Sequence, residues 1–106
     1  MADACRRAGA DRIIAVIPYF GYGRSDHRSA RHEPIMGSLA ARMIESAGVD
    51  HVVTVDLHAP QIEGFFTIPM ENVSAVPLLA AALQPILPLN VAVVAPDAGA
   101  VRGAMQ

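Results

Sequence analysis

Residues 51–58 read His-Val-Val-Thr-Val-Asp-Leu-His, a β-branched run that ends directly on an aspartate and a histidine. A run that is apolar at nearly every position is typical of a strand covered on both faces of a parallel sheet. The pattern occurs upstream in residues 12–17, which Pro18 follows, and downstream in residues 91–95, which Pro96 and Asp97 follow. We therefore expect three strands, at residues 12–17, 51–55 and 91–95.

Helical patterns alternate with these strands. We expect helical segments at residues 2–9, 34–47, 60–64 and 76–86. Residues 67–73 contain Pro69, which has no N–H to donate to a central ladder, so we expect an irregular edge segment there. Strands that alternate with helices predict an α/β fold, a parallel sheet with flanking helices and right-handed crossovers.

Composition narrows the class of protein. The 106 residues are 53% hydrophobic and 17% charged, with a net charge of −2 and one cysteine. This is a globular composition, without the basic stretch of a nucleic-acid-binding surface or an apolar run long enough to cross a membrane. An internal disulfide is impossible with a single cysteine, which fits a reducing compartment. We expect a cytoplasmic protein that binds neither nucleic acid nor membrane.

Polar residues follow each expected strand. Parallel α/β sheets bind ligands beyond the carboxyl ends of their strands, so the three polar segments should meet at one edge. The first, residues 19–32, holds three arginines that could grip phosphate oxygens, and its glycines allow close approach to a ligand. A solvated surface loop explains the same composition.

Asp56 and His58 are two residues apart, so on an extended strand end their side chains would point the same way. Such a pair could hold a divalent ion, although Mg²⁺ prefers oxygen ligands and His58 is its less usual partner. The alternative is an aspartate that caps the next helix and a histidine bonded to backbone. Asp97 could likewise cap a helix, with Gly99 opening an anion-binding turn.

Several segments, in order along nearly the whole chain, resemble ribose-phosphate pyrophosphokinases. Residues 17–26 (Ile-Pro-Tyr-Phe-Gly-Tyr-Gly-Arg-Ser-Asp) resemble the family's arginine loop, and residues 53–66 cover its Asp-Leu-His metal motif. Ile68-Pro69 with Asn72, and residues 94–99, follow at the family's spacing. The chain looks like an internal piece of such an enzyme, because both of its ends read as interrupted helices.

The resemblance implies an incomplete type I phosphoribosyltransferase-like fold. Residues 1–74 would be the latter half of the N-terminal domain, and residues 75–106 the beginning of the C-terminal domain. It also implies transfer of diphosphate from ATP to ribose 5-phosphate with Mg²⁺, in a full-length protein that forms homo-oligomers. Arg24, Ser25 and Asp26 would bind ATP, Asp56 and His58 would form the metal site, and Asp97 would lie on the ribose-phosphate side.

The chain departs from the family's pattern at residues that the family uses near its substrates. Ser25 stands for a usual Gln, His32 for Arg, Thr67 for Asp, and Gly103 for an expected Arg. The family's upstream nucleotide loop, mobile Lys/Arg loop and acidic phosphoribosyl loop have no counterpart here, so we expect no synthesis by this chain alone. One alternative is a non-catalytic regulatory relative that joins the synthetase oligomer. Another is an unrelated small α/β binding module.

Overall fold

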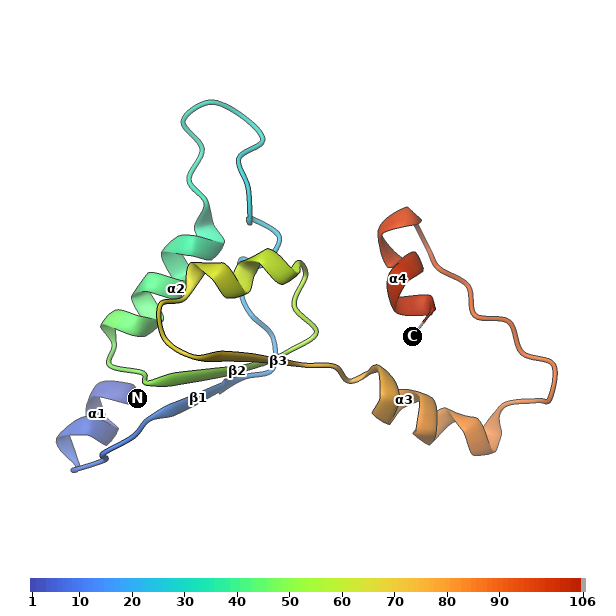
Figure 1. Ribbon diagram of the computed structural model, residues 1–106, viewed down its shortest axis with the longest axis horizontal. Coiled ribbons are helices and arrows are strands. Elements are labelled where there is room, and N and C mark those ends of the chain that lie inside the picture. Colours follow the sequence, from blue (N-terminus) through green and yellow to red (C-terminus); the bar gives the residue numbers. More distant parts are fainter. Residues whose placement is uncertain (106) are drawn as a thin grey trace. The chain divides into compact units, whose positions relative to one another are not determined.

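The computed structural model describes residues 1–105, and the side-chain surroundings of residues 102 and 103 lie outside the description, the departure at Gly103 among them. It divides into two compact units, Met1–Val73 and Ser74–Gln106. In chain order the first unit contains α1 (Ala2–Arg7), β1 (Ile14–Ile17), α2 (Met36–Ser46), β2 (His51–Val55), the 3-10 helix η1 (Pro60–Phe65) and β3 (Met70–Val73). These elements form the sheet and its helices in Figure 1.

The described part of the chain forms a parallel three-stranded sheet of order β1-β2-β3. Ile14 aligns with His51, and Val52 aligns with Met70. The strands predicted at residues 12–17 and 51–55 are confirmed, as is the α/β fold class. Residues 70–73 do lie at a sheet edge, but they form a regular strand rather than an irregular segment. Pro69 is compatible with that strand because it precedes it, and its carbonyl accepts the Val52 N–H at 3.0 Å.

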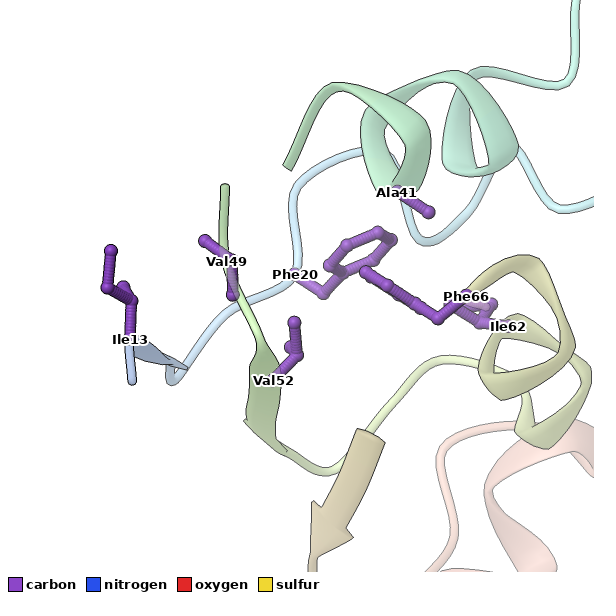
Figure 2. Packing of buried hydrophobic residues seen from close by; sticks show 7 residues of the cluster. All are labelled: Ile13, Phe20, Ala41, Val49, Val52, Ile62 and Phe66. Atoms are coloured by element: carbon purple, nitrogen blue, oxygen red, sulfur yellow. The ribbon is translucent and has the colours of Figure 1, made fainter. Parts of the chain in front are cut away.

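Helices α2 and η1 cover the same face of the sheet (Figure 1). Val52 and Thr54 are fully buried on that face, while their neighbours along β2 are half-buried. Figure 2 shows the aromatic rings of Phe20 and Phe66 lying between α2 and η1. Their ring centroids are 5.7 Å apart in an edge-to-face arrangement, one of the geometries that aromatic pairs prefer. The remaining core members are Ile13, Ala41, Val49 and Ile62.

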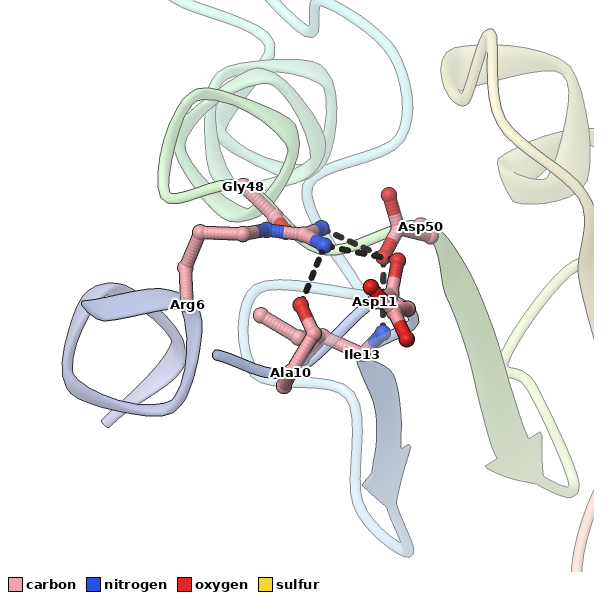
Figure 3. A network of polar contacts seen from close by, with 6 residues as sticks. All are labelled: Arg6, Ala10, Asp11, Ile13, Gly48 and Asp50. Atoms are coloured by element: carbon pink, nitrogen blue, oxygen red, sulfur yellow. Dashed lines mark hydrogen bonds and ion pairs between the residues drawn. The ribbon is translucent and has the colours of Figure 1, made fainter. Parts of the chain in front are cut away.

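Arg6 fastens α1 to the amino end of the sheet, as Figure 3 shows. Its guanidinium donates to the carbonyls of Ala10 and Asp11 at 2.8 Å each, and to the Gly48 carbonyl at 3.0 Å. It also pairs with the Asp50 carboxylate at 2.5 Å. The same carboxylate oxygen accepts the Ile13 N–H at 2.7 Å, so Asp50 joins the starts of β1 and β2.

The second unit contains α3 (Val76–Leu83), η2 (Gln84–Ile86), η3 (Ala98–Ala100) and α4 (Val101–Ala104). Helix α3 with η2 fits the helix predicted at residues 76–86. The strand predicted at residues 91–95 is wrong, because this segment has neither strand nor helix. A strand needs a hydrogen-bonded neighbour, and within residues 1–105 none pairs with this segment. None of the described helices is long and apolar enough to span a membrane.

Candidate functional site

A cavity of about 160 Å³ lies beyond the carboxyl ends of β1 and β2. Four of the eight lining residues come from the loop after β1, and the other four are the last residue of β2 and the three that follow it: Tyr19, Phe20, Gly23, Arg24, Val55, Asp56, Leu57 and His58. The structure therefore brings the predicted residues Arg24, Asp56 and His58 to one cavity. Their role in binding a ligand stays a prediction.

Asp56 has an uncommon backbone conformation. Its φ is +46°, in the left-handed region that few non-glycine residues adopt. The Asp56 N–H donates to the Val73 carbonyl at 3.0 Å, and the Leu57 N–H donates to Asn72 Oδ1 at 3.0 Å, so β3 holds both residues. Asp56 and His58 therefore do not lie on an extended strand end, contrary to what we expected from the sequence. The chain turns after Val55, and this turn places Asp56 and His58 on the same cavity.

The arginine loop is held in a compact form by its own backbone. Tyr22 has a φ of +65°, the Gly23 N–H donates to the Phe20 carbonyl at 3.3 Å, and the Ser25 N–H donates to the Tyr22 carbonyl at 2.9 Å. A Cβ on Gly23 would lie 3.2 Å from the Phe20 carbonyl oxygen and 3.6 Å from the His58 Cβ. The lack of a side chain at Gly23 thus avoids a tight contact with the Phe20 carbonyl inside the loop, while the distance to His58 is an ordinary contact.

Ser25 and Asp26, predicted together with Arg24 as nucleotide contacts, do not line this cavity. Ser25 connects the loop to the start of α2, since its Oγ accepts the Met36 N–H at 3.2 Å and its carbonyl accepts the Gly37 N–H at 3.0 Å. Helix α2 has no capping side chain of its own, so Ser25 supplies that cap from a distance.

The Asp26 carboxylate is buried. It accepts a hydrogen bond from Gln61 Nε2 at 2.6 Å, and its other oxygen lies 2.6 Å from His27 Nδ1. The hydrogen bond with His27 is the main cause that lowers the pKa of Asp26 below its ordinary value, and burial opposes it. Gln61 was not singled out from the sequence, because a bond between residues 35 positions apart leaves no local pattern.

Asp97 lies in the second unit and caps η3. Its side chain accepts the Ala100 N–H at 3.0 Å, which is the capping alternative considered for it. The strand that was to bring it to the same sheet edge does not form in residues 91–95. A place on a ribose-phosphate side stays a prediction for this residue.

The donor set at the cavity fits a hydrated cation better than a metal held wholly by protein. Asp56 offers a carboxylate and His58 an imidazole, and no group of three or more His, Cys, Asp or Glu side chains suitable for a metal occurs in residues 1–105. Mg²⁺ commonly binds through one or two carboxylates and completes its shell with water and substrate phosphates. These residues are therefore compatible with Mg²⁺ carried by a phosphate ligand.

A solved structure defines the class of fold. The crystal structure of phosphoribosylpyrophosphate synthetase from Mycobacterium smegmatis matches with a TM-score of 0.87 and 40% identity, over 98% of this chain and 35% of that one. A sequence model described as the N-terminal domain of ribose phosphate pyrophosphokinase matches residues 1–48. The structural match agrees with the α/β fold of parallel strands and flanking helices.

Curated relatives agree with this assignment. Ribose-phosphate pyrophosphokinase A of Dictyostelium discoideum is 51% identical over 98% of this chain and 33% of its own length. Ribose-phosphate pyrophosphokinase of Marinomonas sp. is 56% identical over 95% of this chain and 32% of its own length. The chain belongs to the ribose-phosphate pyrophosphokinase family, and it spans about a third of the length of these relatives.

Proposed function

We propose that this chain supplies the metal-nucleotide edge of a ribose-phosphate diphosphokinase. That enzyme transfers diphosphate from ATP to ribose 5-phosphate and yields 5-phosphoribosyl 1-diphosphate. The proposal rests on one observation: Arg24, Asp56 and His58 line the same cavity at the carboxyl ends of two parallel strands. Ligands of open α/β sheets bind at such edges.

Each cavity residue has a role suited to its chemistry. Arg24 donates its forked N–H groups to phosphate oxygens, which favours a fixed phosphate orientation. Asp56 would hold Mg²⁺ through its carboxylate, and His58 would serve as a second ligand or as a donor to a phosphate oxygen. Mg²⁺ held here together with ATP would supply positive charge beside the phosphates during phosphoryl transfer.

Activity requires more than this cavity. Diphosphoryl transfer depends on positioning both substrates and on charged groups around the reacting phosphates. Because the chain spans about a third of its relatives, we propose that ribose 5-phosphate and the remaining nucleotide contacts belong to other parts of the whole protein. The 106-residue chain then releases no AMP when it is mixed with ATP, ribose 5-phosphate and Mg²⁺.

The remaining expectations from the family also belong to this proposal. Residues 1–74 act as the latter half of an N-terminal domain, and residues 75–106 begin a C-terminal one. The whole protein works in the cytoplasm as a homo-oligomer. Exposed apolar side chains on β1, such as Ile14 and Val16, support the view that further protein covers this part of the sheet.

A chimera tests the proposal. The corresponding segment of the Mycobacterium smegmatis synthetase is replaced by residues 1–105 of this chain, and AMP release is measured with saturating substrates. We expect retained synthesis that Asp56→Asn in the graft reduces at least about a hundredfold, in keeping with loss of one charged transition-state contact. Glu63→Gln is the matched control, because Glu63 is a nearby carboxylate that does not line the cavity. A folded chimera without activity would instead support the regulatory relative.

A further inference from the structure

The best-buried carboxylate near the candidate site takes no part in lining its cavity. Asp26 has a side-chain exposure of 5%, yet it lies only two residues after Arg24. Both of its oxygens are used, one by Gln61 Nε2 and the other by His27 Nδ1, at 2.6 Å each. A buried carboxylate is stabilised only when it is paired and hydrogen-bonded, so this arrangement depends on both partners.

Gln61 connects the two halves of the cavity. It belongs to η1 and follows His58 by three residues, whereas Asp26 belongs to the arginine loop. Their bond therefore spans the two chain segments whose side chains face the same cavity. The Gly23 backbone also lies near this segment, because a Cβ added to Gly23 would be 3.6 Å from the His58 Cβ and from the Ile62 Cδ1. In the chain, Arg24 follows Gly23 directly and precedes Asp26 by two residues.

We propose that Asp26 and Gln61 are a positioning pair, which fixes the arginine loop against the Asp56–His58 segment so that both reach one phosphate ligand. This inference rests on the proposed function for the ligand, but its structural part can be measured without one. The sequence led us to expect that Ser25 and Asp26 contact the nucleotide directly. In this proposal Asp26 does not touch the nucleotide, and it acts by fixing the position of Arg24. Hydrogen bonds to an ionised carboxylate are stronger than neutral ones, which suits such a clamp.

Hydrogen exchange of the whole chain tests the clamp directly. The Gly23 and Ser25 amides donate within the loop and report its order. Removing either partner, by Asp26→Ala or Gln61→Ala, should lower the protection factors of the Gly23 and Ser25 amides about tenfold. A tenfold change corresponds to the free energy of one hydrogen bond to a charged group. The Val52 amide in the sheet should be unchanged. Unchanged protection of Gly23 and Ser25 in both variants would overturn the proposal.

Glu33→Gln is the matched control for these variants. The Glu33 carboxylate also lies in the long loop, but it accepts the N–H groups of Ser29 and Ala30, at 3.1 and 3.0 Å. Its loss should leave Gly23 and Ser25 protected. Asp26→Asn is the conservative variant, because an amide oxygen can still accept from Gln61 although the charge is lost, and it should retain more protection than Asp26→Ala. Equal loss in Glu33→Gln would contradict a specific clamp.

Gln61→Glu gives a pH signature that simple loss of structure does not. It places two carboxylates within hydrogen-bond reach, and such a pair repels until one of them binds a proton. Loop protection in Gln61→Glu should be low at pH 8 and recover toward pH 5 by more than it does in Gln61→Ala, which keeps the contact between Asp26 and His27 and is therefore the baseline. Protection that does not depend on pH in Gln61→Glu would count against direct contact between these side chains.

Calorimetric titration with ATP and Mg²⁺ measures whether the clamp affects ligand binding. If the clamp positions Arg24, Asp26→Ala and Gln61→Ala should each weaken Mg-ATP binding about tenfold, and the double variant should weaken it no further. Faster loop exchange with unchanged affinity would overturn the positioning role. Absence of Mg-ATP binding by the unaltered chain would remove the proposed function, while the exchange experiment would still decide whether the clamp exists.

Discussion

Asp56 lines the cavity, and its backbone forms the turn that follows β2. A left-handed φ of +46° is tolerated by Asp, Asn and Gly and costs other residues about 1–2 kcal/mol. Asp56→Asn should therefore fold more stably than Asp56→Ala by about 1 kcal/mol in urea unfolding. Both variants should lose the Mg²⁺-dependent part of ATP binding, because neither retains the carboxylate. Equal stability of the two variants would mean that this turn imposes no strain.

Besides Asp26, two carboxylates outside the cavity, Asp50 and Glu45, make stability depend on pH. The Ile13 N–H holds the pKa of Asp50 below its ordinary value of 3.8, and Arg6 adds to this. The Thr67 N–H, 2.5 Å from Glu45, holds the pKa of Glu45 below 4.5. Each lowered pKa means that the unfolded chain binds protons more readily. The stabilisation is complete above the unfolded pKa and is lost as pH falls through the folded one.

We expect the free energy of unfolding to decrease as the pH is lowered below about 4.5. Urea unfolding at several pH values between 7 and 3 measures this decrease. Because Glu45→Gln and Asp50→Asn remove two of these three titrating groups and leave Asp26, the double variant should be less stable at pH 7 and show a shallower decrease. An identical slope in the double variant would place the acid sensitivity elsewhere in the chain.

The sequence predicted some of the residues that lie at the cavity, but it did not predict the hydrogen bonds that hold them in place. Arg24, Asp56 and His58 follow strands, and a parallel sheet gathers such positions at one edge. The burial of Asp26 and its bond to Gln61 depend on how the loop folds onto η1, which no periodicity encodes. The turn at Asp56 was missed for a similar reason, since Asn72 of β3 helps to hold it.

The start of α2 depends on a glycine that has no room for a side chain. A Cβ on Gly37 would lie 3.2 Å from the Phe65 ring, 3.2 Å from the Ser25 carbonyl and 3.3 Å from the Tyr22 carbonyl. Two of these neighbours are backbone and cannot move without disturbing the arginine loop. Gly37→Ala should therefore destabilise the chain by about 1–3 kcal/mol, although alanine is the better helix former.

Gly64→Ala is the control for that substitution, because a Cβ there meets nothing within 4 Å. It should be neutral or slightly stabilising. Thermal unfolding of both variants measures the difference. If the two changed the midpoint equally, close packing at Gly37 could not be the cause.

Elements with a strong local pattern were predicted well. β1, β2 and α2 combine β-branched or helical periodicity with a clear stop, such as Gly48 with its φ of +86° after α2. We expected an irregular segment in place of β3 because Pro69 cannot donate to a ladder. The strand begins one residue after Pro69, at Met70. Residues 91–95 have the composition of a strand but no neighbour to pair with in the described chain. Strand formation depends on pairing, which composition does not report.

At the scale of the whole molecule, the second unit is the less protected part. Residues 87–97 have neither helix nor strand, and Leu89 and Val94 are almost fully exposed. Thermolysin cleaves before large apolar residues, so its first cuts should fall between residues 88 and 95, leaving the sheet-containing unit intact. Mass spectrometry of a limited digest locates these cuts. First cuts within residues 13–73 would contradict the division into two units.

The central claim is that the loop after β1 and the segment after β2 form one metal-nucleotide site. Mn²⁺ can replace Mg²⁺ with ATP and broadens the NMR signals of nearby nuclei. On titrating the ¹⁵N-labelled chain with substoichiometric Mn²⁺ and excess ATP, the signals of residues 19–24 and 55–58 should broaden first and together. Excess Mg²⁺ should restore them. Broadening of only one of these two segments, or first broadening elsewhere in the chain, would contradict a shared site.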